Sequence, residues 1–356
     1  MGGMNYTAVE STKMATAEIY GKTLVELGEK DKRVVALTAD LAKSTKIGDF
    51  QQKFPDRFFN VGIAEQNLFG IAAGMAKSGL IPFASTFSVF ASMRATDQLH
   101  TDICYQRANV KIIGTHSGTS FGQAGSTHHA IEDIAIVRSL ANLKVIVPAD
   151  GYETANAIRA AYEIDGPVYI RINRGFDQVL YKSEDYGFEF GKGVLMNDGD
   201  DITIIANGSC VFQAVQAARI LEADYKINAR VINLHTIKPI DSEIILKAVD
   251  DTRRIITVED HTVIGGLGTA VGEVVLENGK ACAFRKLGLN DRFSELGFHE
   301  DLMSINGIDA ENIVKETLDM MKRSKVVEIA ADGKVQKALK LDDRDFEVDI
   351  DWTDEV

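Results

Sequence analysis

The feature that most constrains the fold of this chain is a regular alternation of short β-branched runs with stretches of helical spacing. The expected strands in the first half are residues 33–40, 81–86, 110–116, 143–150 and 167–172. The expected helices between them are residues 91–106, 130–140 and 151–164, which repeat apolar side chains at helical intervals. Alternation of this kind is typical of a parallel, doubly wound α/β sheet.

A polar, glycine-bearing stretch at residues 181–201 interrupts the alternation and predicts a domain boundary. Beyond it the expected strands are 202–208, 229–239, 254–260 and 283–289, and the expected helices are 211–223, 241–249 and one from Gly268. We therefore expect two doubly wound, mostly parallel-sheet α/β domains, residues 7–185 and 190–323.

The remaining residues, 324–356, form an acidic tail. The chain has a net charge of −13, and residues 341–356 hold eight acidic side chains and one arginine. A DG pair at 332–333 predicts a hairpin, and the alternation of apolar and acidic residues at 346–352 predicts a half-buried strand. We expect the tail to dock onto a partner subunit or a neighbouring copy, with a solvated acidic tail as the alternative.

Charge and composition exclude several classes of function. No basic block compensates the negative charge, which argues against nucleic-acid binding. No apolar run approaches the ~18 residues that span a bilayer, and no secretory signal pattern is present. We therefore expect a cytoplasmic protein that does not bind a membrane. The three cysteines are scattered, and no Cys/His spacing predicts a metal site on this chain.

Polar and aromatic side chains follow the expected strands. Asp40, Phe87, His116 and Arg174 stand at or just beyond strand ends, and Glu65 stands at a strand-to-helix junction. Because the carboxyl ends of parallel strands share one edge of a sheet, these side chains should converge on one crevice.

Each of these residues also has a simpler interpretation. Glu65 in the first turn of a helix complements the helix dipole, which contributes a few tenths of a kcal/mol to ~1 kcal/mol. Phe87 and Phe90 are most often core residues, and a His128–His129 pair in a polar loop is most often solvated. The joint placement of these residues at one sheet edge favours a functional site.

Several segments together resemble the C-terminal half of transketolase, its pyrimidine-binding domain followed by its C-terminal domain. They are FFNVGIAEQNLFGIAAGMAKSGLIPFASTFSVF, STHHAIEDIA, VIVPAD, GPVYIRINRG and TVEDHTVIGGLG. The resemblance runs from about Thr12 to Arg323 and implies the two α/β domains described above. Related thiamine enzymes, deoxyxylulose-phosphate synthase and the beta chain of 2-oxo acid dehydrogenases, share this fold.

The resemblance implies a cofactor, thiamine diphosphate with Mg²⁺. The carboxyl group that matches Glu65 hydrogen-bonds N1′ of the aminopyrimidine ring, so that the cofactor can lose its C2 proton. Phe87 and Phe90 match aromatic residues that pack on this ring, and Asp40 and Ile63 match further cofactor-binding positions. The small residues of the helix after Glu65 are expected at a self-association interface of this domain.

The resemblance also implies a substrate, a sugar phosphate or a related anionic sugar. His116 and His128 match catalytic, donor-binding histidines, and Ser44 and Arg174 match phosphate-binding positions. His129, also expected to bind substrate, stands where the family usually has glutamine. Further departures are Ala124 for an acidic residue, Thr12 for an arginine and Met93 for a tyrosine, and they leave the identity of the sugar open.

The family holds the diphosphate and Mg²⁺ with a GDG motif followed by an asparagine, and the chain contains no GDG. We therefore expect a split enzyme, in which an N-terminal transketolase subunit supplies this motif and the two chains form a heterotetramer. The alternatives are a beta chain of a 2-oxo acid dehydrogenase, a deoxyxylulose-phosphate-synthase-like enzyme and a non-catalytic assembly partner.

Overall fold

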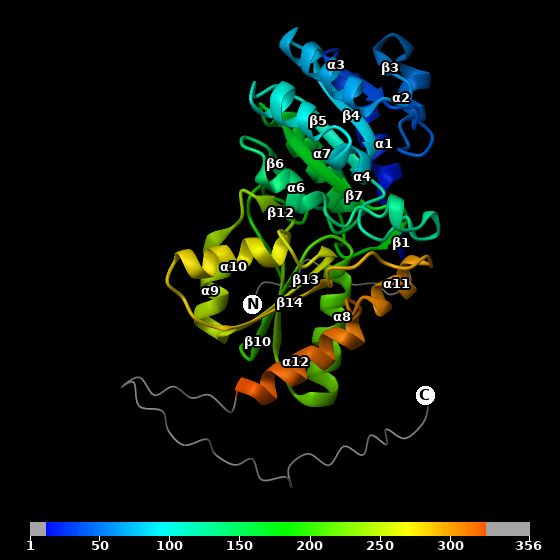
Figure 1. Ribbon diagram of the computed structural model, residues 1–356. Coiled ribbons are helices and arrows are strands. Elements are labelled where there is room, and N and C mark those ends of the chain that lie inside the picture. The colour runs from blue at the N-terminus through cyan, green and yellow to red at the C-terminus, as the bar shows by residue number, and fades with distance from the viewer. Residues whose placement is uncertain (1–11, 325–356) are drawn as a thin grey trace, which may run out of the picture.

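The computed structural model describes residues 12–324, which form two α/β domains stacked one on the other (Figure 1). Two predictions lie outside the described residues: the start of the first domain at residue 7, and the hairpin and strand of the tail. Within residues 12–324 no helix has the length and apolar composition needed to cross a membrane.

The first domain is built on a seven-stranded sheet. Its strands are β2 (Val34–Thr38), β3 (Phe58–Asn60), β4 (Ile81–Phe87), β5 (Lys111–Thr115), β6 (Lys144–Ile146), β7 (Val168–Ile172) and β12 (Thr236–Lys238). They lie in the order β12-β6-β7-β5-β4-β2-β3. All neighbours are parallel except β12, which pairs antiparallel with β6. The sheet is the doubly wound one that the alternation predicts.

Helices cover both faces of this sheet. The helical segments are α1 (Thr16–Lys30), α2 (Gly48–Lys53), η1 (Pro55–Arg57), α3 (Glu65–Lys77), α4 (Ser88–Met93), α5 (Thr96–Gln98), the π-helix η2 (Leu99–Cys104), η3 (Gly122–Ala124), η4 (Ser126–His128), α6 (Asp133–Ser139) and α7 (Gly151–Glu163). Apolar residues of α1, α2 and α7 pack on one face, and those of α3, η2 and α6 pack on the other. Both faces are therefore buried, as in parallel sheets generally.

The second domain has a five-stranded sheet in the order β14-β13-β10-β11-β9. Its strands are β9 (Val194–Asn197), β10 (Ile202–Ala206), β11 (Ala229–Asn233), β13 (Arg254–Thr262) and β14 (Ala283–Leu289), and its helices are α8 (Cys210–Tyr225), α9 (Ser242–Thr252), α10 (Leu267–Glu277), α11 (His299–Ile305) and α12 (Ala310–Ser324). Helices α8 and α12 pack on one face (Figure 1). The opposite face and its helices α9 and α10 share one apolar core with the first domain.

The structure differs from the sequence prediction in three segments. Residues 229–239, expected to form one strand, form β11 of the second sheet and β12 of the first. Residues 91–106, expected to form one helix, hold the end of α4, then α5 and η2. The expected boundary at 181–201 contains the strand β9. A small additional sheet pairs β1 (Lys13–Ala15) antiparallel with β8 (Phe176–Gln178).

Candidate active site

Glu65 is the first residue of α3, and its side chain is buried, with 4% of the residue exposed. Its Oε1 accepts hydrogen bonds of 3.4 Å from the Thr86 hydroxyl and from Arg94 Nη1, and Arg94 Nη1 lies 3.4 Å from Oε2 as well. These contacts are at the long end of the range for hydrogen bonds. The carboxylate is therefore buried but weakly held, with capacity to accept a stronger donor.

Beside Glu65 lies an aromatic cluster made of Phe87, Phe90, His116, Phe121 and His128. The Phe87 and His116 ring centroids are 4.4 Å apart, and His116 and Phe121 meet edge to face at 4.5 Å. His128 lies edge to face against Phe90 and Phe121, at 5.4 and 5.6 Å. The Arg94 guanidinium carbon lies 3.6 Å from the centroid of the Phe90 ring, so Arg94 contacts both the aromatic cluster and Glu65.

His116 follows β5 with a φ of +60° and is buried in the cluster. Burial, and to a smaller extent the nearby positive charges of Arg174 and Lys46, lower the pKa of His116 to about 3. Its Nδ1 is buried with no hydrogen-bond partner among the described residues. His116 is thus a neutral imidazole with a ring nitrogen free for a ligand.

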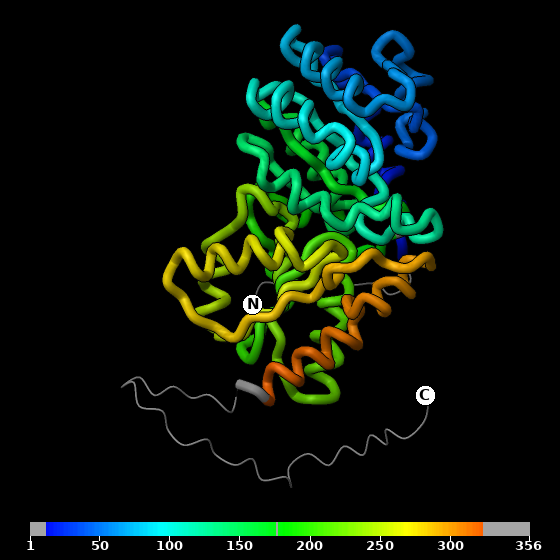
Figure 2. Tube along the Cα trace, in the orientation of Figure 1, coloured from blue at the N-terminus to red at the C-terminus, as the bar shows by residue number. Residues whose placement is uncertain are grey.

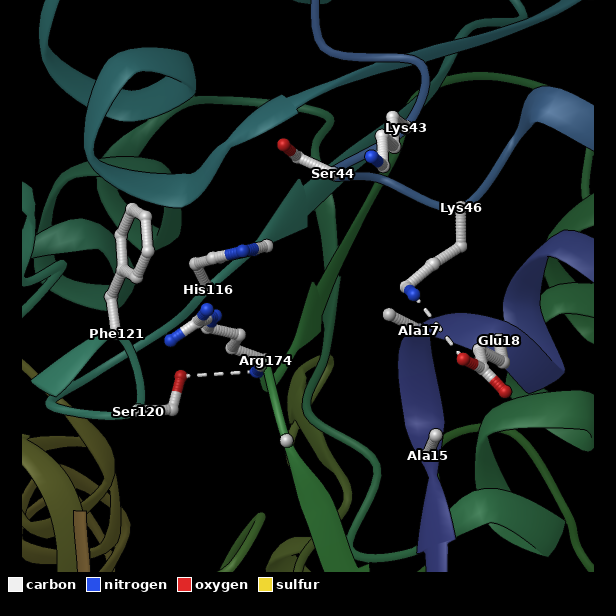
Figure 3. Close-up of a pocket in the computed structure, with 11 residues that line it drawn as sticks. Ala15, Ala17, Glu18, Lys43, Ser44, Lys46, His116, Ser120, Phe121 and Arg174 are labelled. Carbon is white, nitrogen blue, oxygen red and sulfur yellow. Dashed lines mark hydrogen bonds and ion pairs between the residues drawn. The ribbon is translucent and has the colours of Figure 1, made fainter. Parts of the chain in front are cut away.

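A cavity of about 530 Å³ opens next to His116 and carries an excess of positive charge (Figure 3). We call it the cationic cavity. Its lining residues are Ala15, Ala17, Glu18, Lys43, Ser44, Lys46, His116, Ser120, Phe121, Arg174 and Gly175. Lys46 Nζ lies 3.2 Å from Glu18 Oε1, so one of the three cations is paired within the cavity. The remaining positive charge suits an anionic ligand.

Most of the other residues predicted from the sequence fall into two groups. Ser44, His116 and Arg174 line the cationic cavity, and Phe87, Phe90 and His128 belong to the aromatic cluster. Three predicted residues lie apart from both groups.

Asp40 is exposed, and its backbone N–H donates to Asn60 Oδ1. Ile63 is 77% exposed on the surface next to Glu65. His129 is buried with its Nε2 at 3.1 Å from the carbonyl of Gly122, a contact inside its own loop, and it does not line the cationic cavity.

Lys43, Lys46, Phe121 and Arg94 are site residues that sequence reasoning missed. The two lysines flank Ser44 in the segment after β2. Their close spacing around an expected phosphate-binding serine is a sequence signal for an anion site. Phe121 stands six residues from the end of a strand, and only the fold of its loop brings it onto His116.

Among residues 12–324, no cluster of three or more His, Cys, Asp or Glu side chains has the geometry of a metal site. The buried carboxylate, the aromatic cluster and the cationic cavity lie together at the carboxyl edge of the first sheet. They can bind a flat heterocycle beside a carboxylate, and an anionic molecule next to it.

Comparison with known proteins finds a matching family model for each domain. Residues 12–176 match the family model of the transketolase pyrimidine-binding domain, and residues 191–313 match that of the transketolase C-terminal domain. A candidate transketolase C-terminal section of Methanocaldococcus jannaschii is 46% identical over 85% of this chain and 95% of its own length. One of the subunits of an apulose-4-phosphate transketolase of Phocaeicola vulgatus is 37% identical over 87% of this chain and 98% of its own length.

A solved structure described as a split-gene transketolase in an inactive β4 tetramer has a similar fold. It superposes with a TM-score of 0.79 and is 45% identical, covering 87% of this chain and 99% of that one.

Proposed function

Because the chain belongs to the transketolase family, we propose that it is the C-terminal subunit of a two-chain, thiamine-diphosphate-dependent transketolase. In this proposal it transfers a two-carbon ketol unit from a ketose to an aldose. One observation carries the proposal: a buried, weakly held carboxylate, an aromatic cluster and a cationic cavity share one sheet edge.

The site fits the pyrimidine half of thiamine diphosphate. Glu65 would hold a proton against a ring nitrogen, since its two oxygens have only long contacts now. Phe87 and Phe90 would hold the flat ring by stacking. When bound, the cofactor supplies the nucleophilic carbon that carries the ketol unit. Burial of Glu65 keeps water away from the proton that it shares.

The diphosphate half is assigned to the partner subunit. The chain has no GDG motif, and residues 12–324 hold no cluster of three or more His, Cys, Asp or Glu side chains with the geometry of a metal site. The relative solved as a split-gene transketolase is described as an inactive β4 tetramer, which supports a requirement for another subunit. We propose a heterotetramer with an N-terminal subunit that carries GDG and asparagine.

The substrate we propose is a phosphorylated or otherwise anionic sugar. Arg174 presents a guanidinium to the cationic cavity, and Ser44 presents a hydroxyl. His116 and His128 would orient sugar hydroxyls through their ring nitrogens, and the neutral His116 ring can both donate and accept. A 2-oxo acid dehydrogenase would need to hold only a small oxo acid, and a cavity of about 530 Å³ lined by three cations fits a sugar phosphate better.

The proposal is tested by co-expressing the chain with a candidate N-terminal subunit that contains GDG and asparagine. Ketol transfer between a phosphorylated ketose and an aldose is measured in the purified complex with Mg²⁺ and thiamine diphosphate. We expect activity in the complex and none in either chain alone. Decarboxylation of pyruvate without ketol transfer would instead identify a 2-oxo acid dehydrogenase.

The role of Glu65 is tested in the same complex with Glu65→Gln, which keeps the shape and removes the charge. Cofactor activation by general acid–base chemistry contributes ~10²–10⁴-fold, so we expect a loss in this range for both C2 proton exchange and ketol transfer. The matched control is Glu243→Gln, which changes an exposed carboxylate in the first turn of α9. If both substitutions have an equal, small effect, Glu65 has no catalytic role and only complements the dipole of α3.

A further inference from the structure

The loop of residues 116–130, here called the active-site loop, carries three of the five members of the aromatic cluster. Every residue that lines the cationic cavity belongs to the first domain. The active-site loop nevertheless lies against the second domain, beside the end of β13 and the segment before α11 (Figure 2). The second domain therefore contacts the part of the chain that carries His116, Phe121 and His128.

Asp260, near the carboxyl end of β13, makes the central contact. Its Oδ2 accepts the backbone N–H of Thr119 at 2.9 Å, and its Oδ1 accepts the Thr119 hydroxyl at 3.0 Å. Asp260 is 2% exposed and Thr119 is fully buried. A buried carboxylate that receives both donors of one residue fixes the position of that residue strongly.

His299, the first residue of α11, extends this contact. Its Nδ1 lies 3.1 Å from the Thr119 hydroxyl oxygen. The single hydroxyl proton of Thr119 is directed to Asp260, so we assign the proton of this second contact to His299 Nδ1. The resulting chain of donors runs from His299 through Thr119 to Asp260.

The backbone of the loop is also shaped to fit the second domain. A Cβ on Gly118, which has a φ of +56°, would lie 2.0 Å from Asp260 Oδ2. A Cβ on Gly122, with a φ of +41°, would lie 2.4 Å from the carbonyl oxygen of Gly297. Only glycine permits these approaches.

Further polar contacts hold the C-terminal part of the loop. The Ser126 hydroxyl donates to the carbonyl of Ser294 at 2.8 Å. Arg171 Nη2 donates to the carbonyl oxygens of Ala130 and Asp260, at 3.0 and 2.8 Å. The loop is thus held along most of its length by groups of the second domain or by Arg171.

We propose that Asp260 is a positioning residue, through which the C-terminal domain sets the positions of His116 and His128 for ketol transfer. The catalytic consequence rests on the proposed function, but the positioning itself does not. A displacement of about 1 Å in a group that orients substrate can cost ~10²-fold in rate.

The test compares Asp260→Asn with Asp241→Asn. Asp260→Asn replaces one of the two carboxylate oxygens with an NH₂ group. This group would face either the backbone N–H or the hydroxyl of Thr119, both of which donate to Asp260. Asp241 is a matched control because it is also a buried carboxylate of the second domain that accepts backbone N–H groups, from Gly193 and Ile244, away from the loop. Thr119→Ser keeps both donors and serves as the conservative variant.

The first measurement is the imidazole ¹⁵N spectrum of the full chain labelled at its seven histidines. We expect Asp260→Asn to shift the His116 and His128 signals, and Thr119→Ser to leave them in place. Asp241→Asn should shift His235, whose pKa it influences, and leave His116 and His128 unchanged. Unchanged His116 and His128 signals in Asp260→Asn would overturn the proposal.

The second measurement is steady-state ketol transfer by the two-chain complex. We expect Asp260→Asn to lower kcat by ~10–100-fold, with Thr119→Ser and Asp241→Asn within about three-fold of the unchanged chain. Equal losses for Asp260→Asn and Asp241→Asn would show a purely structural contact and overturn the proposal. If the unchanged complex transfers no ketol unit, the proposed function fails, and the imidazole spectra still decide whether Asp260 positions the loop.

Discussion

At the residue scale, the charge state of His116 decides which hydrogen bonds its ring can make with a ligand. Its pKa is lowered to about 3, first by burial and then by Arg174 and Lys46. At neutral pH it therefore offers one acceptor and one donor rather than two donors. Lys46 is paired with Glu18, whereas the Arg174 guanidinium also lines the cavity and suits the anionic end of a ligand, so different side chains can bind hydroxyls and charge.

The lowered pKa of His116 predicts a pH dependence of stability. An unfolded histidine has a pKa of about 6.5, so between pH 6.5 and about 3 the unfolded chain binds a proton that the folded chain does not. The contribution is present above pH 6.5 and is lost as the pH falls. Relative to His116→Asn, the unchanged chain should lose up to ~1.4 kcal/mol of unfolding free energy per pH unit below pH 6.

Asparagine is chosen at position 116 because it tolerates the left-handed backbone found there. Urea unfolding at pH 7, 6 and 5 gives the slope, and exposed His100→Asn is the control. Parallel slopes for the unchanged chain and His116→Asn would contradict the lowered pKa.

The cationic cavity makes a second prediction at this scale. Arg174→Ala should raise KM for a phosphorylated ketose ~10-fold or more, and Lys46→Gln ~3–10-fold, because each removes a charged contact. Glu18→Gln should lower KM, since it frees Lys46 from its ion pair. Lys30→Gln changes an exposed lysine at the end of α1 outside the cavity and is the control.

The measurement is steady-state kinetics of the two-chain complex with a phosphorylated ketose and its unphosphorylated counterpart. The substitutions should leave KM for the unphosphorylated sugar nearly unchanged, and should leave kcat nearly unchanged for both. A KM that rises equally for the two sugars would show that these side chains do not bind the phosphate group.

At the element scale, β12 shows how the second domain is tied to the first. It pairs antiparallel with β6, although it lies only three residues after β11 of the other sheet. Lys238, its last residue, donates from Nζ to the carbonyls of Arg138 and Leu140 at the end of α6. A cation at this end of a helix also complements the helix dipole.

Lys238→Met keeps the aliphatic stem and removes these two donors. We expect a loss of ~1–3 kcal/mol in unfolding free energy, measured by urea unfolding of the full chain. Lys247→Met, at an exposed i,i+4 pair on α9, should cost less than ~0.5 kcal/mol. If the two substitutions cost the same, Lys238 contributes only as a surface lysine.

Sequence reasoning predicted most of the parallel strands of the first domain because each is a short run rich in β-branched and other apolar residues, as Val34–Thr38 shows, where all five residues are buried. It missed the division of residues 229–239 because the chain from Ala229 to Lys238 is largely buried, and neither glycine nor proline separates β11 from β12. It placed Glu65, Phe87 and His116 at one edge because strand ends have that property in any parallel sheet. It missed Asp260 because contacts between distant segments leave no local pattern.

At the scale of the whole molecule, the two domains behave as one unit. One apolar core runs from residues of α3 and α6 to residues of α9 and α10. The active-site loop lies against the second domain through Asp260 and the segment before α11. The chain therefore holds the aromatic cluster and the cationic cavity in one preformed unit, and in the proposed function the partner subunit supplies the group that binds the diphosphate.

That division makes a prediction about the isolated chain. In the proposed function its residues hold the pyrimidine half of the cofactor, so thiamine diphosphate and thiamine should bind the isolated chain with similar, weak affinity, and Mg²⁺ should make no difference. In the two-chain complex, thiamine diphosphate should bind ~10²-fold or more tighter than thiamine, because at least two charge-assisted contacts to the diphosphate are added.

Isothermal titration calorimetry of the full chain and of the complex, each with and without Mg²⁺, measures these affinities. Glu65→Gln serves as the control, because it should weaken both ligands equally in the isolated chain if the pyrimidine ring is what the chain holds. A large preference of the isolated chain for the diphosphate that depends on Mg²⁺ would show that this chain binds the whole cofactor, and the assignment of the diphosphate to a partner would fall. A small preference without Mg²⁺ would trace to the cationic cavity, and Arg174→Ala should abolish it.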